Sequence, residues 1–203
     1  MSGTISSIWN KLSSFAQKLG NSEKFIQKAK LDYSKVLDQY NEKRRFISRN
    51  FNPAKLNSSL LLQNFYPWRE SLACFYLLIF SGFRHTALRE VRYYIETSAR
   101  SYFIDWKYPE KTYEEKVKKL HKVRFNKFKE LVQSLPVEKR VEINDFYGDL
   151  CNYVHLSEIT QTDALRDFEL GLILGHPEYE EDKEMLAKAV TYSCYMLSQI
   201  FKE

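Results

Sequence analysis

Glycine and proline, the two residues that most often interrupt regular structure, are scarce in this chain. The 203 residues include 6 Gly and 5 Pro, whereas 44% of the residues are apolar. An all-β fold needs many turns, and a disordered chain does not contain so many apolar residues. The sequence therefore predicts a compact, all-α protein.

Apolar residues recur at the spacing of helix faces and divide the chain into two regions. Residues 1–50 predict a basic, amphipathic helical extension, with helices over 4–19 and 23–49. A polar stretch over 50–59, rich in Asn and Ser, predicts a loop. A helical body then occupies residues 60–203.

A helix that starts near Pro67 is expected to carry the apolar run to Phe83, and further long helices are expected over about 84–106, from Pro136 onward, and over about 179–201. Thr112 and Glu115 have the spacing of a capping box and predict the start of a shorter helix. The side chains expected to face the core are Leu88, Val91, Ile95, Ala99 and Tyr102 in the helix over 84–106, and Val141, Phe146, Leu150 and Val154 in the helix from Pro136 onward.

The charges are divided unevenly along the chain. Residues 1–129 contain 25 basic and 11 acidic residues, a net charge of +14. Residues 130–203 contain 6 basic and 15 acidic residues, a net charge of −9, so the whole chain has +5. We expect that the basic region contacts a polyanion, or that the two regions contact each other within one chain or between chains.

The basic residues form three groups, on the helix 23–49, on the helix 84–106 and in a lysine-rich run over 111–129. Basic residues along a helix are typical of a surface that contacts nucleic acid, although a solvated helix face has the same pattern. The candidate nucleic-acid contacts are Lys43, Arg44, Arg45, Arg89, Arg92, Arg100, Lys118, Lys119 and Lys122.

One side of the helix 84–106 combines three of these arginines with an acid. Glu96 lies four residues from both Arg92 and Arg100, and Arg89 lies one turn further away. An Arg guanidinium matches the geometry of phosphate oxygens and keeps its charge, which favours a phosphate-binding row. A structural ion network around Glu96 explains the same spacing, so both interpretations stay open.

A histidine near the end of the next long helix is the candidate acid or base. His155 follows Asn152 by three residues, so their side chains share a helix face. An imidazole that titrates near neutral pH beside an amide can transfer protons. The alternative is a histidine that only stabilises the helix end through the helix dipole.

Two stretches of the body carry a family resemblance. They are Leu-Arg-Glu-Val-Arg-Tyr-Tyr-Ile-Glu at 88–96 and Asn-Tyr-Val-His-Leu-Ser at 152–157. Both resemble the HEPN superfamily (higher eukaryotes and prokaryotes nucleotide-binding), and the resemblance covers about residues 65–200. It implies an antiparallel helical bundle, often a homodimer, with RNA-directed activity in defence or toxin–antitoxin-like systems.

The resemblance is incomplete at the catalytic motif. HEPN ribonucleases have an Arg shortly before the catalytic His, whereas positions 149–151 here are Asp, Leu and Cys. A Glu followed four residues later by a basic residue is matched by Glu96 and Arg100. For a ribonuclease, the resemblance implies metal-independent cleavage, with His155 as acid or base, Arg92 and Arg100 on phosphate, and Glu96 orienting one Arg.

The sequence has no motif for a cofactor, a metal or a membrane span. It lacks a nucleotide-binding glycine motif and any His or Cys spacing that suits a metal, so no cofactor is expected. The 3 dispersed cysteines indicate free thiols in a reducing compartment, and we expect the cytoplasm. The apolar run over 71–83 is too short to cross a bilayer.

Two functions are compatible with these observations. The preferred one is binding of RNA or another nucleic acid, with cleavage left open by the missing Arg. The alternative is an assembly protein, in which the basic residues 1–129 dock on the acidic residues 130–203 of another copy or on a partner. We expect a homodimer or a protein partner in addition to nucleic acid.

Overall fold

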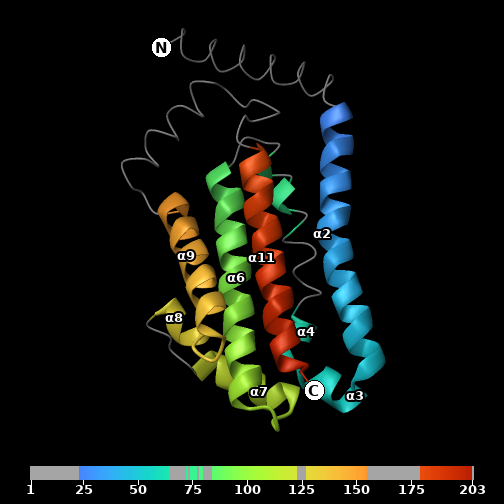
Figure 1. The fold of residues 1–203 in the computed structure, drawn as a ribbon, viewed down its shortest axis with the longest axis vertical. Helices are drawn as coiled ribbons and strands as arrows, with labels where there is room; N and C mark the ends of the chain where they lie inside the picture. The colour runs from blue at the N-terminus through green and yellow to red at the C-terminus, as the bar shows by residue number, and fades with distance from the viewer. Residues whose placement is uncertain are drawn as a thin grey trace, which may run out of the picture.

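The computed structural model describes residues 23–64, 84–122, 127–154 and 179–202, together with several positions between 72 and 79. These residues form helices joined by turns, and no strand occurs among them (Figure 1). The prediction of an all-α protein is therefore confirmed. The helix expected over 4–19 lies outside the described residues.

Four long helices make up most of the described fold, and they agree with the helices expected from the sequence. They are α2 (Glu23–Asn50), α6 (Arg84–Lys107), α9 (Val137–Val154) and α11 (Tyr179–Ile200). The shorter described helices are α3 (Pro53–Ser58), α4 (Leu60–Gln63), α7 (Tyr113–Lys122) and α8 (Phe128–Leu131).

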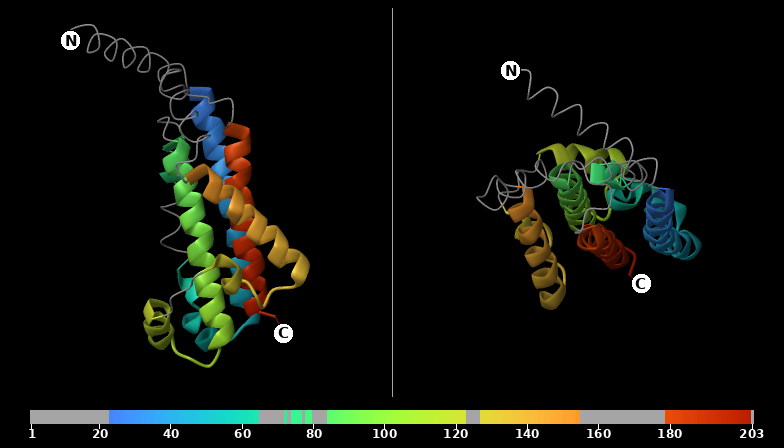
Figure 2. Two further views of the ribbon diagram at one scale, coloured as in Figure 1. Left: turned by 90° about the vertical axis from the view of Figure 1, so that its left-hand side faces the viewer. Right: turned by 90° about the horizontal axis from the view of Figure 1, so that it is seen from above.

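The long helices form a bundle around α6. α6 packs against α9 on one side and against α11 on the other, and α2 packs on α11. Seen from above, α9 and α2 therefore lie at opposite edges of the bundle (Figure 2). Surfaces on these two helices cannot belong to one continuous site within a single chain.

The long helices do not alternate regularly in direction. α6 and α11 run parallel, since Arg84 contacts Asp182 near the N-terminal ends of both helices and Ser98 contacts Ser193 further along. Figure 1 shows α2 running in the same direction and α9 running in the opposite one. The antiparallel packing that the family resemblance implies is found here between α6 and α9.

α6 contributes the centre of the hydrophobic core. Its predicted inner face is buried over its whole length, as expected from the helical spacing of apolar residues. Full burial of each large apolar side chain contributes about 1.5–3 kcal/mol to stability. The residues of this face are Leu88, Val91, Ile95, Ala99 and Tyr102.

α9 has a buried and an exposed face, and one of the predicted inner residues lies on the exposed one. Phe146 and Leu150 are buried together with Ile143, which confirms the expectation for the first two. The prediction that Val141 faces inward is wrong, because this side chain is 50% exposed. Val141 lies two positions before Ile143, five before Phe146 and nine before Leu150. In a helix with 3.6 residues per turn, these separations place Val141 on the side opposite to the buried residues. The side chain of Val154 lies outside the described ones.

α2, the second helix of the predicted extension, contributes to the same core. Val36, Tyr40 and Ile47 are buried and belong to the hydrophobic cluster that includes α6 and α11. Gln39 Nε2 donates a hydrogen bond of 2.9 Å to Thr191 Oγ1 on α11. The position of α2 is thus set by contacts with the rest of the chain.

The stretch predicted as a loop over 50–59 contains the short helix α3. Asn52 caps this helix, since its side-chain oxygen accepts a hydrogen bond of 2.8 Å from the backbone N–H of Ala54. Pro53 at the first helical position has no N–H that would need a partner. The Asn-Pro pair that suggested a loop is therefore the start of a helix.

A buried aspartate joins α6, α4 and α7 at one end of the bundle. Asp105 accepts hydrogen bonds of 2.8 Å from Ser59 Oγ and 2.9 Å from the backbone N–H groups of Leu60 and Leu61. It also forms an ion pair of 3.0 Å with Lys116 Nζ, which is buried as well. Four donors thus stabilise this carboxylate and fix the junction.

The predicted capping box at the start of α7 is confirmed. The backbone N–H of Thr112 donates to Glu115 Oε2 at 3.1 Å, and the backbone N–H of Glu115 donates to Thr112 Oγ1 at 3.3 Å. The backbone hydrogen bond from Thr112 and the nearby Lys111 lower the pKa of Glu115. The cap orients α7 and its lysines at this end of the bundle.

Candidate nucleic-acid interface

A row of polar and basic side chains follows one face of the C-terminal half of α2. These residues recur at intervals of three and four, the spacing of one helix face. They border a hollow of about 400 Å³. The described residues that line it are Asn41, Arg44, Arg45, Ser48 and Arg49.

Two of these arginines carry uncompensated charge. Arg45 and Arg49 are exposed, and neither forms an ion pair with any residue in the described ranges of the chain. They lie four residues apart, so their guanidinium groups can point to the same space. An Arg fork binds two oxygens of a phosphate group at once, which makes this hollow suitable for a polyanion.

Lys43, predicted to act with Arg44 and Arg45, lies on another side of the helix. Its Nζ is 5.9 Å from the centroid of the Phe46 ring. Its charge also acts on the buried thiol of Cys194 in α11, where burial raises the pKa to about 12 and Lys43 opposes that rise. At 100° per residue, positions 43 and 45 point in nearly opposite directions, which the sequence already indicated.

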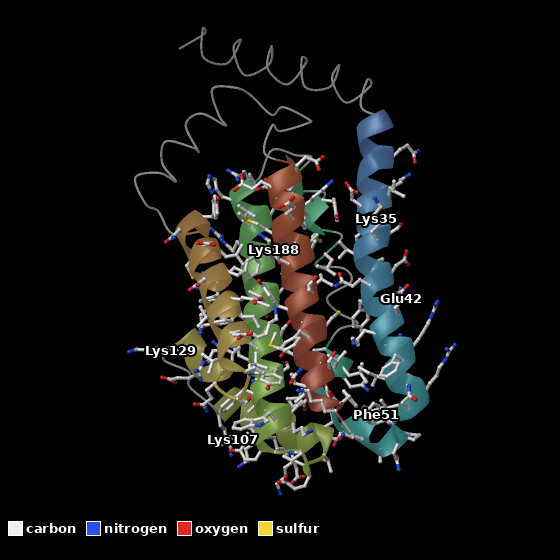
Figure 3. All side chains as sticks on the ribbon, in the orientation of Figure 1. Lys35, Glu42, Phe51, Lys107, Lys129 and Lys188 are labelled. Atoms are coloured by element: carbon white, nitrogen blue, oxygen red, sulfur yellow. The ribbon has the colours of Figure 1, made fainter. Side chains whose placement is uncertain are left out.

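A second basic surface lies at the end of the bundle where α6 meets α7. The side chains of Lys118, Lys119 and Lys122 are exposed on α7. Lys119 Nζ lies 5.2 Å from the centroid of the Tyr108 ring. Figure 3 shows Lys107 on the same lower region of the molecule. This end of the bundle presents several positive charges to solvent.

Lys116 belongs to the same lysine-rich run, but the structure removes it from this surface. Its ammonium group is buried against Asp105 and stabilises the junction of the helices. The spacing along α7 gives no signal for this, because Lys116 lies only three positions before Lys119, which is exposed.

Of the row predicted on α6, Arg92, Glu96 and Arg100 form a network with α9. Glu96 Oε1 accepts hydrogen bonds from Arg100 Nη2 at 2.7 Å and from Arg100 Nε at 3.1 Å. Tyr147 Oη of α9 donates to Glu96 Oε2 at 3.2 Å, and Arg92 Nη2 donates to Tyr147 Oη at 3.3 Å. Glu96 thus orients Arg100, and both of its oxygens have protein partners.

Tyr147, which the sequence patterns did not single out, is central to this network. Burial raises the pKa of its hydroxyl to about 12; the charge of Glu96 adds to that shift, and the hydrogen bond from Arg92 opposes it. The Phe128 ring stacks on the Tyr147 ring with the centroids 3.9 Å apart. For Arg92, burial lowers the pKa, but the hydrogen bond to Tyr147 and the nearby Tyr147, Cys151 and Glu96 groups together outweigh it, so the net shift is upward. The network is therefore well packed, although Arg92 Nε is buried without a hydrogen-bond partner among the described residues.

The predicted catalytic residues are only partly covered by the structure. Asn152 is exposed on α9, and Arg89, one of the predicted nucleic-acid contacts, is exposed on α6. His155 lies outside the described residues, so its role stays a prediction. Near the end of α9 the structure places His85, whose Nδ1–H donates a hydrogen bond of 3.1 Å to the backbone oxygen of Tyr153.

The predicted binding residues therefore occupy three separate surfaces. The arginines of α2 lie at one edge of the bundle, the network of α6 and α9 lies toward the other edge, and the lysines of α7 lie at one end (Figures 1 and 2). Within the described ranges, no group of three or more His, Cys, Asp and Glu side chains could hold a metal ion. No helix in those ranges is long and apolar enough to cross a membrane.

Comparisons with protein-family models, with curated proteins and with solved structures give no match to this chain. The resemblance to the HEPN superfamily therefore stays a prediction, and the interpretation of the site depends on its own chemistry.

Proposed function

We propose that this protein binds nucleic acid, with RNA as the first candidate, through the outer face of α2. The observation that carries the proposal is the hollow of about 400 Å³ lined by Arg44, Arg45 and Arg49. Two of these guanidinium groups, those of Arg45 and Arg49, are exposed and form no ion pair within the described ranges. The backbone of nucleic acid supplies regularly spaced phosphates that match such a row.

The lysines at the end of the bundle form a second, separate positive surface. Lys118, Lys119 and Lys122 contribute charge that attracts a polyanion and increases the association rate. Two of the predicted arginines of α6 are less suitable, because Arg100 is engaged by Glu96 and Arg92 by Tyr147, whereas Arg89 is exposed but lies apart from the hollow on α2. We therefore assign the phosphate contacts to α2 and α7, and we propose binding without cleavage.

A titration of labelled RNA tests this proposal. Fluorescence anisotropy would compare the wild type with the double variant Arg45→Glu and Arg49→Glu. The control is the double variant Lys188→Glu and Lys202→Glu, which changes the net charge equally at exposed positions elsewhere. We expect the α2 variant to bind at least about tenfold more weakly than the control variant, since charge-assisted hydrogen bonds contribute about 1.5–3 kcal/mol each. Equal affinities of the two variants would contradict the proposal.

Self-assembly is the second candidate function, and the outer face of α9 favours it. Val137 and Val141 are 64% and 50% exposed on this face. Lys127 and Lys129, at the start of the neighbouring helix α8, have the opposite charge to the acids of α9, so two copies could pair these surfaces. The exposed acidic residues, which follow one another at helical spacing, are Glu138, Glu142, Asp145 and Asp149.

Light scattering after size exclusion tests the assembly function. The wild type should have a mass above that of one chain, and the mass should fall when salt is added. Val141→Asp should return the protein to a single chain, whereas Tyr93→Asp, at an exposed ring on α6, should not. A wild type that remains a single chain at high concentration and low salt would exclude this candidate.

We further propose that the protein acts in the cytoplasm. Its three cysteines, Cys74, Cys151 and Cys194, are free thiols, which a reducing compartment maintains. Fractionation of cells that express the tagged chain tests the location, and recovery from an oxidising compartment would contradict it.

A further inference from the structure

An exposed aromatic ring lies beside the arginines of α2. The side chain of Phe46 is 59% exposed, whereas Val36, Tyr40 and Ile47 of the same helix are buried. Single exposed apolar residues are common on protein surfaces and need no explanation by themselves. The position of this one is informative because Phe46 lies three residues before Arg49, so the two side chains are neighbours on the helix surface.

Cationic groups flank the ring on two sides. Lys43 Nζ lies 5.9 Å from the ring centroid, and Arg49 lies one turn further along α2. The backbone oxygen of Phe46 accepts a hydrogen bond of 2.7 Å from Asn50 Nδ2, which stabilises the last turn of the helix under the ring. An exposed ring between cations, next to a hollow lined by arginines, combines the two elements with which proteins bind single strands.

We infer that the nucleic acid bound at α2 is single-stranded, with one base stacked on Phe46 and its phosphates on Arg45 and Arg49. This inference rests on the proposed function. In a duplex both faces of each base are covered by neighbouring pairs, so a ring on the protein surface cannot reach them. In a single strand the faces are accessible, and every base can stack on an aromatic side chain.

An acidic neighbour limits the affinity of this site. Glu42 lies four residues before Phe46 and three before Arg45, and it is exposed on the outer edge of α2 (Figure 3). A carboxylate at this position repels a phosphate that binds Arg45. Glu42→Gln should therefore strengthen binding about two- to threefold, as expected for one surface charge.

Binding of single-stranded and duplex RNA of the same sequence, followed by anisotropy at one salt concentration, tests the inference. The full-length wild type should prefer the single strand. Phe46→Ala should weaken single-strand binding by about 5- to 150-fold, the range for the stacking of one base, and leave duplex binding unchanged. Phe46→Trp should restore the affinity. Leu31→Ala is the matched control, since Leu31 is 57% exposed on the same helix.

A fluorescent base gives a second readout. An oligonucleotide with 2-aminopurine should change its fluorescence on binding to the wild type and not on binding to Phe46→Ala. If charge reversal at Arg45 and Arg49 weakens binding but Phe46→Ala does not, the proposed function stands and base stacking is overturned. If neither weakens binding, both proposals fail. Equal losses for single strand and duplex, or a loss of self-association without a loss of RNA binding, would also overturn the inference.

Discussion

Arg84, Arg92 and Arg100 of α6 have hydrogen-bond partners on neighbouring residues, whereas Arg45 and Arg49 of α2 have no ion-pair partner among the described residues, although both helices carry arginines at helical spacing. On α6, Arg84 pairs with the buried Asp182, Arg100 pairs with Glu96, and Asp105 pairs with Lys116. On the outer face of α2, Arg45 and Arg49 have no ion-pair partner among the described residues. The neighbours of an arginine, rather than its spacing along the helix, determine whether it stabilises the fold or is available to a ligand.

Replacing Asp105 should cause the largest loss of stability among the paired charges. Asp105→Ala leaves the ammonium of Lys116 buried without a partner and removes the acceptor for three further donors, including Ser59 Oγ. The free energy of unfolding should fall by about 3–5 kcal/mol. Lys116→Met should cost less, because Asp105 keeps its other three donors. Urea denaturation measures both changes, and a larger loss for Lys116→Met would contradict this ranking.

The network between α6 and α9 should respond with a smaller loss. Glu96→Ala removes the acceptor of Arg100 and Tyr147 and should lower the free energy of unfolding by about 1.5–3 kcal/mol. Affinity for RNA should stay within about twofold of the wild type, the size expected for one surface charge. Glu90→Ala on the same helix is the control. If Glu96→Ala instead weakens RNA binding without changing stability, the network is a ligand site rather than a structural one.

Tyr147 makes stability depend on alkaline pH. Its folded-state pKa of about 12 exceeds the ordinary tyrosine value of 10.0, so the folded state holds the proton more tightly than the unfolded state. This contribution to stability is fully present below pH 10.0 and is lost as the pH rises through about 12. Between these values the wild type should lose stability more steeply than Tyr147→Phe, with Tyr93→Phe as control. Parallel curves for wild type and Tyr147→Phe would refute this.

The exposed Arg45 and Arg49 of α2 should contribute little to the fold. Arg45→Ala and Arg49→Ala should each change the free energy of unfolding by no more than about 0.5 kcal/mol, as is usual for exposed positions without partners. Thermal denaturation of each variant provides the measurement. A loss above about 2 kcal/mol would indicate a structural role for these arginines comparable to that of a buried pair.

Several of these features could be predicted from the sequence because they depend on local spacing. The buried face of α6 from Leu88 to Tyr102 follows from apolar periodicity, and the capping box follows from Thr112 and Glu115. The pairing of Glu96 with Arg100 follows from their separation by four residues. Each involves residues within a few turns of one helix.

The features that could not be predicted depend on contacts between helices. The partner of Arg92 is Tyr147, 55 positions away on α9, and Lys116 is buried because Asp105 of the preceding helix faces it. Val141 is apolar but exposed, because burial on α9 depends on which side of the helix packs against α6. The outward position of Phe46 likewise follows from the packing of Val36, Tyr40 and Ile47 in the core.

The dependence of RNA affinity on salt tests the central claim most directly, because it counts phosphate contacts. The logarithm of the binding constant falls linearly with the logarithm of salt concentration, with a slope of about −0.7 for each single-strand phosphate contact. If Arg45 and Arg49 each bind one phosphate, replacing both with Gln should make the slope shallower by about 1.4. The same replacement at Lys188 and Lys202 should leave it unchanged. A slope that is identical for the wild type and the α2 variant would contradict the claim that α2 binds the nucleic-acid backbone.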